Sequence, residues 1–275
     1  AMFRGPTMNI KERFEAGQID AAVQEAQAEV RRHPGDVSHR SLLAELLCFA
    51  DLERADGQLE TIGRQDSQAL LGVSLFRQLI RAETARRQFY REGRLPEFLG
   101  GVSPRLQLHL QASIAVRENR PAEAAEWLQQ AESQRPATPG TCNGQPFDDL
   151  RDLDDLTASF FEVLTTTGKY YWVPMEQVVE IEFHPPLRPR DQFWRGARLA
   201  VRGGPEGEVF LPVLYVGSES EADEHLRLGR SSDWRGGEGE PVRGLGRRCF
   251  LVGDRDLSIM ELQSLTFETP AAVEK

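Results

Sequence analysis

The spacing of apolar residues predicts helices over most of residues 9–136. Apolar side chains recur every three or four positions from Ile10 onward, which is the spacing of one helix face. Gly17 divides the first stretch into two short helices, and the Pro-Gly pair at 34–35 ends the second. The next helix, with Ser38 as its candidate N-cap, is strongly apolar, with Leu42, Leu43, Leu46, Leu47 and Phe49.

A period of 34 residues is visible in this helical part. Gly17 and Asp51 lie 34 positions apart, and Asn119 falls three such periods after Gly17. A small or turn-forming residue between paired helices at this period is typical of tetratricopeptide repeats, because one helix pair cannot bury its apolar face without a neighbour. The third unit, about residues 72–103, departs from the pattern at FYREGRLPEFLGG. We therefore predict an irregular array of helical repeats.

The segment RPATPGTCNGQP, residues 135–146, is rich in Pro, Gly, Thr and Asn and marks a change of pattern. Such a composition is typical of a connection between two folded parts. The division that we predict is an expression-tag remnant over residues 1–7, a helical-repeat domain over 8–136, a linker over 137–146, an α+β domain over 147–268 and a tail over 269–275.

The second part is expected to begin with one more helix and to continue as strands. Residues 147–168, FDDLRDLDDLTASFFEVLTTTG, are predicted to be helical and to end at Gly168. In VVEIEF, residues 178–183, apolar side chains alternate with Glu180 and Glu182, which is the period of a strand. The segments RLAVR, EVFLPVLYV and RCFLV follow between Gly- and Pro-rich turns. The expected fold class is α+β, with tetratricopeptide-like helices followed by a small, mainly β domain.

Composition and charge narrow the classes of partner. The chain has 275 residues and a net charge of -10, which argues against nucleic acid as a partner because phosphate binding needs a basic surface. No apolar run reaches the ~20 residues that span a bilayer, so we expect a cytoplasmic protein without membrane insertion. The three cysteines are widely spaced and odd in number, which fits reduced thiols better than a disulfide framework.

Motifs for catalysis, metals or cofactors are absent from the sequence. The five histidines show no zinc-ligand spacing, and neither a GxSxG nor a GxxxxGK[ST] motif occurs. The acidic run from Asp148 to Asp155 is interpreted as the N-terminal turn of the helix expected there, since helix N-termini favour negative charge. Cys142, in the predicted linker, is expected to be exposed but not activated. We predict no catalytic, metal-binding or cofactor-binding residue.

Aromatic and arginine side chains gather in two segments of the second part. TTTGKYYWVP contains Tyr170, Tyr171 and Trp172, and strand alternation places Tyr171 on the face opposite the other two rings, so the three cannot line one cage. HPPLRPRDQFWRGA contains a second group of candidates, Arg188, Arg190, Asp191 and Trp194. Arginine and tryptophan are typical of binding hot spots, but also of internal ion-paired contacts between elements. The internal contact is favoured, and both interpretations remain open.

Four blocks in this order resemble the ImpE family, also called the SciE-type or TagJ family, of type VI secretion clusters. They are ATPGTCNGQPFDDL, then EVLTTTGKYYWVPMEQVVEIEFHPPLRPRDQFWRGA, GEVFLPVLYVGSE and GLGRRCFLVGD. The resemblance extends from about Met8 to Phe267. It implies a non-enzymatic adaptor that binds the small subunit of the contractile sheath through a short helical segment. It also implies a link from sheath material to the AAA+ ATPase, ClpV, that disassembles the sheath.

The hypothesis that combines these observations is the docking of an amphipathic helix in an apolar groove of the helical repeats. Leu43, Leu46 and Leu47 are the groove candidates. The acidic balance of the chain would steer a segment that carries basic residues. The alternative is a small-ligand-binding protein or enzyme that uses the Tyr, Trp and Arg cluster of residues 170–195.

Overall fold

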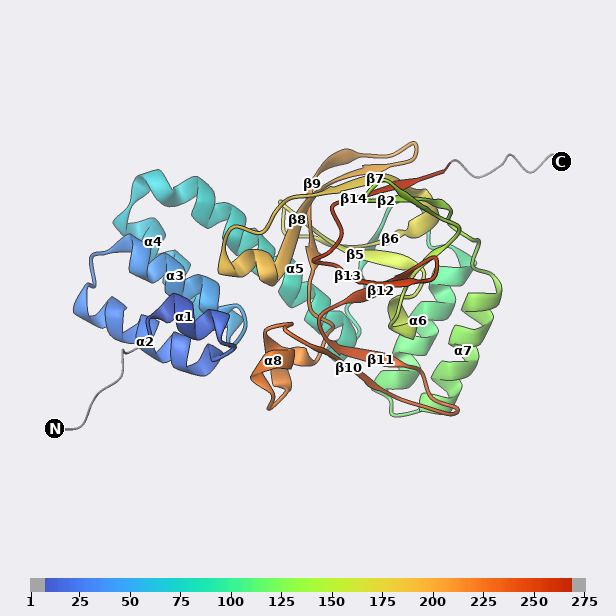
Figure 1. Ribbon diagram of the computed structural model, residues 1–275, viewed down its shortest axis with the longest axis horizontal. Helices are drawn as coiled ribbons and strands as arrows, with labels where there is room; N and C mark the ends of the chain where they lie inside the picture. The colour runs from blue at the N-terminus through green and yellow to red at the C-terminus, as the bar shows by residue number, and fades with distance from the viewer. Residues whose placement is uncertain (1–7, 269–275) are drawn as a thin grey trace.

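The computed structural model describes residues 8–268, and helices come first along the chain (Figure 1). The segments predicted as a tag remnant, 1–7, and as a tail, 269–275, lie outside the described residues. The helices before the sheet are α1 (Ile10–Glu15), α2 (Ile19–Arg32), α3 (Val37–Leu47), α4 (Leu52–Gln65), α5 (Leu70–Glu92), α6 (Pro104–Arg117) and α7 (Pro121–Ser133), with a 3-10 turn η1 (Ser67–Ala69) before α5.

Local capping signals set the ends of these helices. Asn9 caps α1 and forms a capping box with Glu12, so that each side chain accepts the other residue's main-chain N–H. Gly17 has φ +81°, which suits the turn between α1 and α2. The predicted cap of α3 was wrong by two positions: the carboxylate of Asp36, rather than Ser38, accepts the N–H groups of Ser38 and His39.

The 34-residue period marks turns between paired helices, with one exception. Gly17 follows α1, Asp51 caps α4 and Asn119 lies between α6 and α7 with φ +56°. The position expected to turn in the third unit is Ala85, which lies inside α5 instead. Because neither glycine nor proline occurs between Val73 and Glu92, one continuous helix of 23 residues takes the place of a helix pair.

A nine-stranded sheet follows the helices. All neighbouring strands are antiparallel except β1 and β6, which pair in parallel. In spatial order the strands are β1 (Glu97–Phe98), β6 (Tyr170–Pro174), β5 (Phe160–Thr165), β9 (Glu206–Pro212), β8 (Trp194–Val201), β7 (Val178–Phe183), β14 (Ser264–Phe267), β2 (Gly140–Cys142) and β3 (Gln145–Phe147). The predicted strand VVEIEF coincides with β7.

Two smaller sheets and one short helix complete the described residues. The three-stranded sheet is β13 (Arg255–Ser258), β12 (Cys249–Val252) and β4 (Leu150–Asp152), and the hairpin is β10 (Ser232–Arg235) and β11 (Arg243–Gly246). Short α8 (Glu224–Arg227) lies before the hairpin, and the remaining 3-10 turns are η2 (Asp155–Thr157), η3 (Met175–Gln177), η4 (Pro189–Gln192) and η5 (Ser218–Ser220). The expected α+β fold class, with helices followed by a mainly β part, is confirmed. The tetratricopeptide-like character of the helices stays a prediction.

The helix predicted over residues 147–168 was wrong. This stretch contains the end of β3, then β4, η2 and β5. Residues 160–164 of β5 are buried on both faces of the strand, so the apolar run lacks the alternation that identifies a strand. Gly168, with φ +81°, forms the turn between β5 and β6 rather than a helix end.

The linker predicted over residues 137–146 was also wrong. It contains β2 and the first residues of β3, which form a hairpin at the edge of the large sheet. Asn143 and Gly144 connect them with φ values of +51° and +77°, the conformation of a two-residue type I′ turn. The Asn-Gly pair was a turn signal in the sequence, but the Pro- and Gly-rich composition around it masked the strands.

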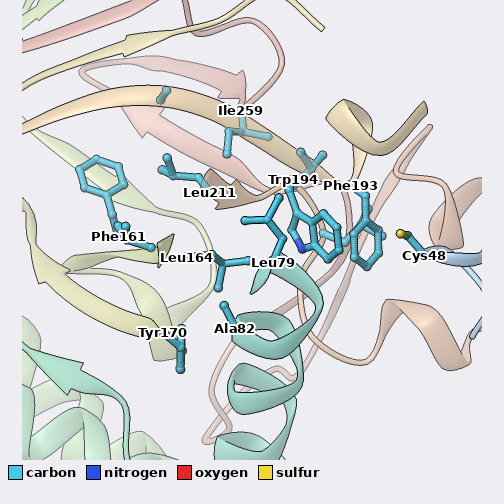
Figure 2. Close-up of a cluster of buried hydrophobic side chains, with 14 of the residues drawn as sticks. Cys48, Leu79, Ala82, Phe161, Leu164, Tyr170, Phe193, Trp194, Leu211 and Ile259 are labelled. Carbon is cyan, nitrogen blue, oxygen red and sulfur yellow. The ribbon is translucent and has the colours of Figure 1, made fainter. Parts of the chain in front are cut away.

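One hydrophobic core runs through both the helices and the sheet. It contains buried residues from α1 to α5 together with residues from β5, β6, β7 and β8. Figure 2 shows Leu79 and Ala82 of α5 facing Leu164 and Trp194 of the sheet, with Phe193 next to Cys48 beyond them. The helical array and the sheet therefore stabilise each other, because neither covers this apolar surface alone.

Within the described range of 8–268, no helix is both long enough and apolar enough to cross a membrane.

Candidate functional site

The aromatic strand β6 is an internal element. Tyr170 and Trp172 are 2% and 0% exposed, whereas Tyr171 points to the other face and is partly exposed. The indole Nε1 of Trp172 donates to the Tyr170 hydroxyl at 2.6 Å, and that hydroxyl donates to Glu162 at 2.5 Å. Trp172 also stacks on Phe160 with ring centroids 4.1 Å apart. The polar atoms of both rings are thus satisfied inside the protein.

Glu162 of β5 is the centre of a buried ion network. Its carboxylate accepts Nε and Nη2 of Arg86 at 3.0 and 3.1 Å, the hydroxyl of Tyr90 at 2.9 Å, and a guanidinium N–H of Arg248. Burial alone would raise the pKa of Glu162, but the charges of Arg86 and Arg248 outweigh it and lower the pKa to about 2. The carboxylate therefore stays ionised.

The network continues through the acidic run that was interpreted as a helix N-terminus. That interpretation was wrong, because no α-helix forms there, only the short 3-10 turn η2, and Asp149, Asp152, Asp154 and Asp155 pair with arginines. Asp152, fully buried, accepts Nη1 of Arg248 at 2.6 Å, and Asp154 accepts Nε of Arg243 at 3.1 Å. Burial raises the pKa of Asp152 to about 6 in spite of the Arg248 charge. The run thus fixes β4 and η2 to β11 and β12.

These network residues were missed at the level of sequence, although one signal was present. Glu162 is a single charge inside the apolar segment FFEVL, and such a charge must be paired when the segment is buried. Its partners Arg86 and Arg248 lie 76 and 86 positions away. No local pattern connects residues at such distances, so the pairing required the fold.

The RPRD segment fastens β8 to the helices. Asp191 accepts the main-chain N–H groups of Leu187 and Arg188, each at 2.9 Å, which closes the turn η4. The Arg190 guanidinium lies 4.8 Å from the ring centroid of Phe76 in α5, a cation–π contact. Burial raises the pKa of the Glu45 carboxyl in α3, against the opposing charges of Arg190 and Arg188.

Trp194 joins this segment to the ion network. Its side chain is 1% exposed, and Nε1 donates to Glu83 of α5 at 3.4 Å. Glu83 in turn accepts Nη1 of Arg86 at 3.1 Å. The two aromatic segments are therefore connected through α5 and do not enclose a common pocket; the cavity between Glu83, Arg86 and Tyr215 measures ≈ 10 Å³, room for one water.

The three groove candidates of α3 lie in the core. Leu43 is 3% exposed, and Leu46 and Leu47 are fully buried. Leu43 and Leu47 therefore face the inside of the array rather than an open groove. Leu46, although fully buried, lies directly beneath a surface cleft.

This surface cleft, called here the docking cleft, has a volume of ≈ 430 Å³ and lies between the first helices and the RPRD segment. Leu187 on its rim is 85% exposed, which is unusual for a leucine. The lining residues are Ile10, Lys11, Phe14 and Glu15 of α1, Leu42 and Leu46 of α3, and Pro186, Leu187, Arg188, Pro189 and Gln192 of the opposite wall. The cleft thus joins one groove candidate with two residues of the RPRD block, Arg188 and Pro189.

One serine–histidine pair resembles a nucleophile and its base. The hydroxyl of Ser159 lies 2.9 Å from Nε2 of His109, and Nδ1 of His109 lies 3.0 Å from the main-chain oxygen of Leu156. Both residues are buried, each 2% exposed. Burial lowers the pKa of His109 to about 3, so the ring is a weak base, and the pair acts as a contact between α6 and β5.

Cysteine and metal chemistry find no support in the described residues. Cys142 is fully buried in β2, which corrects the prediction of an exposed thiol, and burial raises its pKa. Residues 8–268 contain no group of three or more His, Cys, Asp or Glu side chains arranged to hold a metal ion.

Comparison with known proteins identifies relatives over nearly the whole chain. The family described as ImpE protein matches residues 144–266. The chain is 30% identical to the type VI secretion system accessory component TagJ of Pseudomonas aeruginosa over 262 residues, covering 95% of this chain and 92% of that protein. The crystal structure of protein VPA1032 from Vibrio parahaemolyticus matches with a TM-score of 0.89 and 30% identity, covering 96% of this chain and 99% of that one.

These similarities include both the helical array and the sheet, and the family match contains the Tyr-Tyr-Trp strand and the RPRD segment. The agreement in sequence and in structure extends over the same residues. The chain therefore belongs to the ImpE family of type VI secretion accessory components.

Proposed function

We propose that this chain is a non-enzymatic adaptor that binds the small subunit of the type VI secretion sheath. In this proposal a short amphipathic helix of that subunit lies in the docking cleft, in the cytoplasm. The observation that carries the proposal is the cleft itself, with the 85% exposed Leu187 on its rim, in a chain whose family serves type VI secretion. A link from the bound subunit to the AAA+ ATPase is the second part of the proposal and rests on the family resemblance.

The shape and chemistry of the cleft suit a helix with one apolar face. Phe14 and Leu42 supply an apolar floor with the fully buried Leu46 beneath it, and Pro186 to Pro189 supply a wall stiffened by proline. A helix presents apolar side chains at positions i, i+3 or i+4, and i+7 along one stripe, and two or three of these anchors occupy a groove of this kind. Lys11 and Arg188 at the rim are placed to meet polar side chains beside that stripe.

Net charge and apolar burial would contribute differently to binding. The net charge of -10 attracts a segment of net positive charge at long range, which raises the association rate more than the affinity. Burial of the apolar anchors in the cleft would supply most of the affinity.

The alternative, a small-ligand site in the Tyr, Trp and Arg cluster, gains no support from the geometry. Tyr170, Trp172 and Trp194 are buried, and their polar atoms bond to protein groups. The adaptor role is therefore the one function that we propose.

The test compares Leu187→Asp with Leu71→Asp. Both leucines are 85% exposed, so neither substitution disturbs the core, but only Leu187 lines the docking cleft. Leu187→Asp should weaken binding of the purified small sheath subunit by about tenfold or more in calorimetry, because a carboxylate would replace an apolar contact. Leu71→Asp should bind as the original chain does.

A sheath subunit that lacks its terminal helix provides the second arm. It should show no measurable binding to either variant or to the original chain. Equal affinity of Leu187→Asp and Leu71→Asp would contradict the cleft as the site, and retained binding of the shortened subunit would contradict helix docking.

A further inference from the structure

Short helix α8 and the residues after it lie against the first two helices, next to the docking cleft. Arg227 of α8 forms a double ion pair with Asp20 of α2, at 2.8 and 3.1 Å, and Glu224 accepts the main-chain N–H of Asp20 at 2.7 Å. These contacts, more than 200 positions apart in the sequence, hold α8 beside α1 and α2 (Figure 1).

Arg230 extends from this segment to the α1 wall of the cleft. Its guanidinium lies 5.2 Å from the ring centroid of Phe14, and Nη2 donates to the main-chain oxygen of Phe14 at 3.3 Å. Phe14 and the following Glu15 both line the docking cleft. Arg230 does not itself line the cleft, and its positive charge is held directly beside one wall of the proposed helix site.

Arg247 lies beside Arg230 on the neighbouring piece of backbone. Its main-chain N–H donates to the oxygen of Ser231 at 3.0 Å. At Gly229, which has φ +61°, an added Cβ would come within 3.6 Å of the Cβ of Arg247, so the two segments are in contact. The fold therefore brings two half-buried arginines together.

This pair lacks a matching anion. Among residues 8–268 neither guanidinium has a carboxylate within ion-pair distance, in contrast to Arg227 with Asp20. The buried Nε atoms of Arg230 and Arg247 have no hydrogen-bond partner, a property that the ion-paired Arg227 shares. Glu15 and Glu261 are the carboxylates that act on Arg230 and Arg247 from a longer range. Burial, and then the charge of Arg247, lowers the pKa of Arg230. Adjacent, partly desolvated cations are unfavourable, and an anion between them would offset that energy.

We propose that Arg230 and Arg247 form a carboxylate site at the α1 end of the docking cleft. Its ligand is an aspartate or glutamate side chain of the helical segment that docks there. Guanidinium groups bind carboxylates through charge-assisted hydrogen bonds, which fix position as well as affinity. The inference rests on the proposed function and adds a requirement to it: the helix must combine an apolar stripe with an acidic side chain beside one end of that stripe.

The test uses the full chain and a synthetic peptide of the terminal helix of the small sheath subunit. Arg230→Gln with Arg247→Gln should weaken binding by about 10- to 100-fold and flatten its dependence on NaCl concentration. Arg198→Gln with Arg235→Gln is the matched control, because it removes the same net charge from exposed side chains that pair with Glu206 and Glu221 at the surface. This control should leave the affinity within about threefold of the original.

Peptides in which each acidic residue in turn becomes its amide identify the partner group. One of these peptides should lose affinity for the original chain but show no further loss with the double glutamine variant, because the same contact is already absent. Arg230→Lys with Arg247→Lys should restore part of the affinity, which separates charge from a change in folding. Melting temperatures of all variants are measured alongside.

Two results separate failure of this inference from failure of the proposed function. Should Leu187→Asp abolish binding while the double glutamine variant binds normally with unchanged salt dependence, the cleft stands and the carboxylate site is wrong. Should Leu187→Asp bind normally, the cleft itself is wrong, and with it the placement of a carboxylate at its end.

Discussion

At the scale of single residues, the most distinctive feature of this molecule is a group of charged side chains that lie buried in its interior. Glu162 accepts hydrogen bonds from two arginines and two tyrosines, all of them at least partly buried. Removing such a carboxylate from water costs free energy. The buried charge is tolerated only when oppositely charged and hydrogen-bonding groups surround it. The pairing explains why Tyr170, which looks like a ligand-binding residue in the sequence, serves the interior.

Removal of the central charge should therefore destabilise the protein strongly. In Glu162→Gln the positive charges of Arg86 and Arg248 lose their common anion while they stay buried, and we expect a loss of about 3–5 kcal/mol in the free energy of unfolding. Urea denaturation followed by circular dichroism measures it. The control is Glu206→Gln, which breaks an exposed pair with Arg198 and should change stability by less than about 1 kcal/mol. Similar losses in the two variants would refute the structural role of Glu162.

At the scale of elements, the hairpin β2–β3 shows how closely strands approach at the sheet edge. Gly140 of β2 faces the backbone of β14, and a Cβ added there would lie 2.1 Å from the oxygen of Thr266. No side chain can occupy this position unless the two strands separate. Gly207 of β9 is a strand glycine in the opposite situation, with open space around it.

Alanine substitution of these two glycines should give different results. Gly140→Ala should lower the free energy of unfolding by about 1–3 kcal/mol, because β2 must shift away from β14. Gly207→Ala should change it by less than about 0.5 kcal/mol. Thermal unfolding compares both with the original chain, and hydrogen exchange of the β14 amides locates the change. An unaltered melting temperature of Gly140→Ala would show that the strands do not meet as described.

The same scale shows what the sequence could and could not predict. Strand β7 and the turns at Gly17, Asp51 and Asn119 were predicted because alternation and turn residues are local signals. Strand β5 was missed because both of its faces are buried, which removes the alternation. The docking cleft could not be predicted, since its walls come from residues 10–46 and 186–192, and only tertiary packing brings them together.

At the scale of the whole molecule, buried titratable groups link stability to pH. The pKa of His109 is about 3 in the folded chain and 6.5 in a model peptide, so the unfolded state binds a proton first as pH falls. Stability from this group is complete above pH 6.5 and is lost between pH 6.5 and 3. Asp152 acts in the opposite direction: because its folded pKa is raised, its contribution to stability increases as the pH falls from 6 to 3.8. The folded pKa of Glu162 is lowered, so its contribution to stability is lost as the pH falls from 4.5 to 2.

Comparison with His109→Gln isolates the histidine. Between pH 6 and 4 the original chain should lose about 1.4 kcal/mol per pH unit relative to this variant, measured by urea denaturation at several pH values. Ser159→Ala is the control: it removes the hydroxyl partner of His109, at 2.9 Å, but keeps the ring, so its stability should run parallel to that of the original chain. Parallel curves for His109→Gln as well would falsify the linkage.

The distance along the chain between the two walls of the docking cleft has a consequence for synthesis. Phe14 and Leu46 leave the ribosome long before Leu187, which is encoded about 140 residues after Leu46, a delay of roughly 7–28 s at ordinary elongation rates. Arg230 follows later still. A nascent chain that ends before Leu187 lacks one wall of the cleft, so under the proposed function partner binding would be confined to chains that are nearly finished.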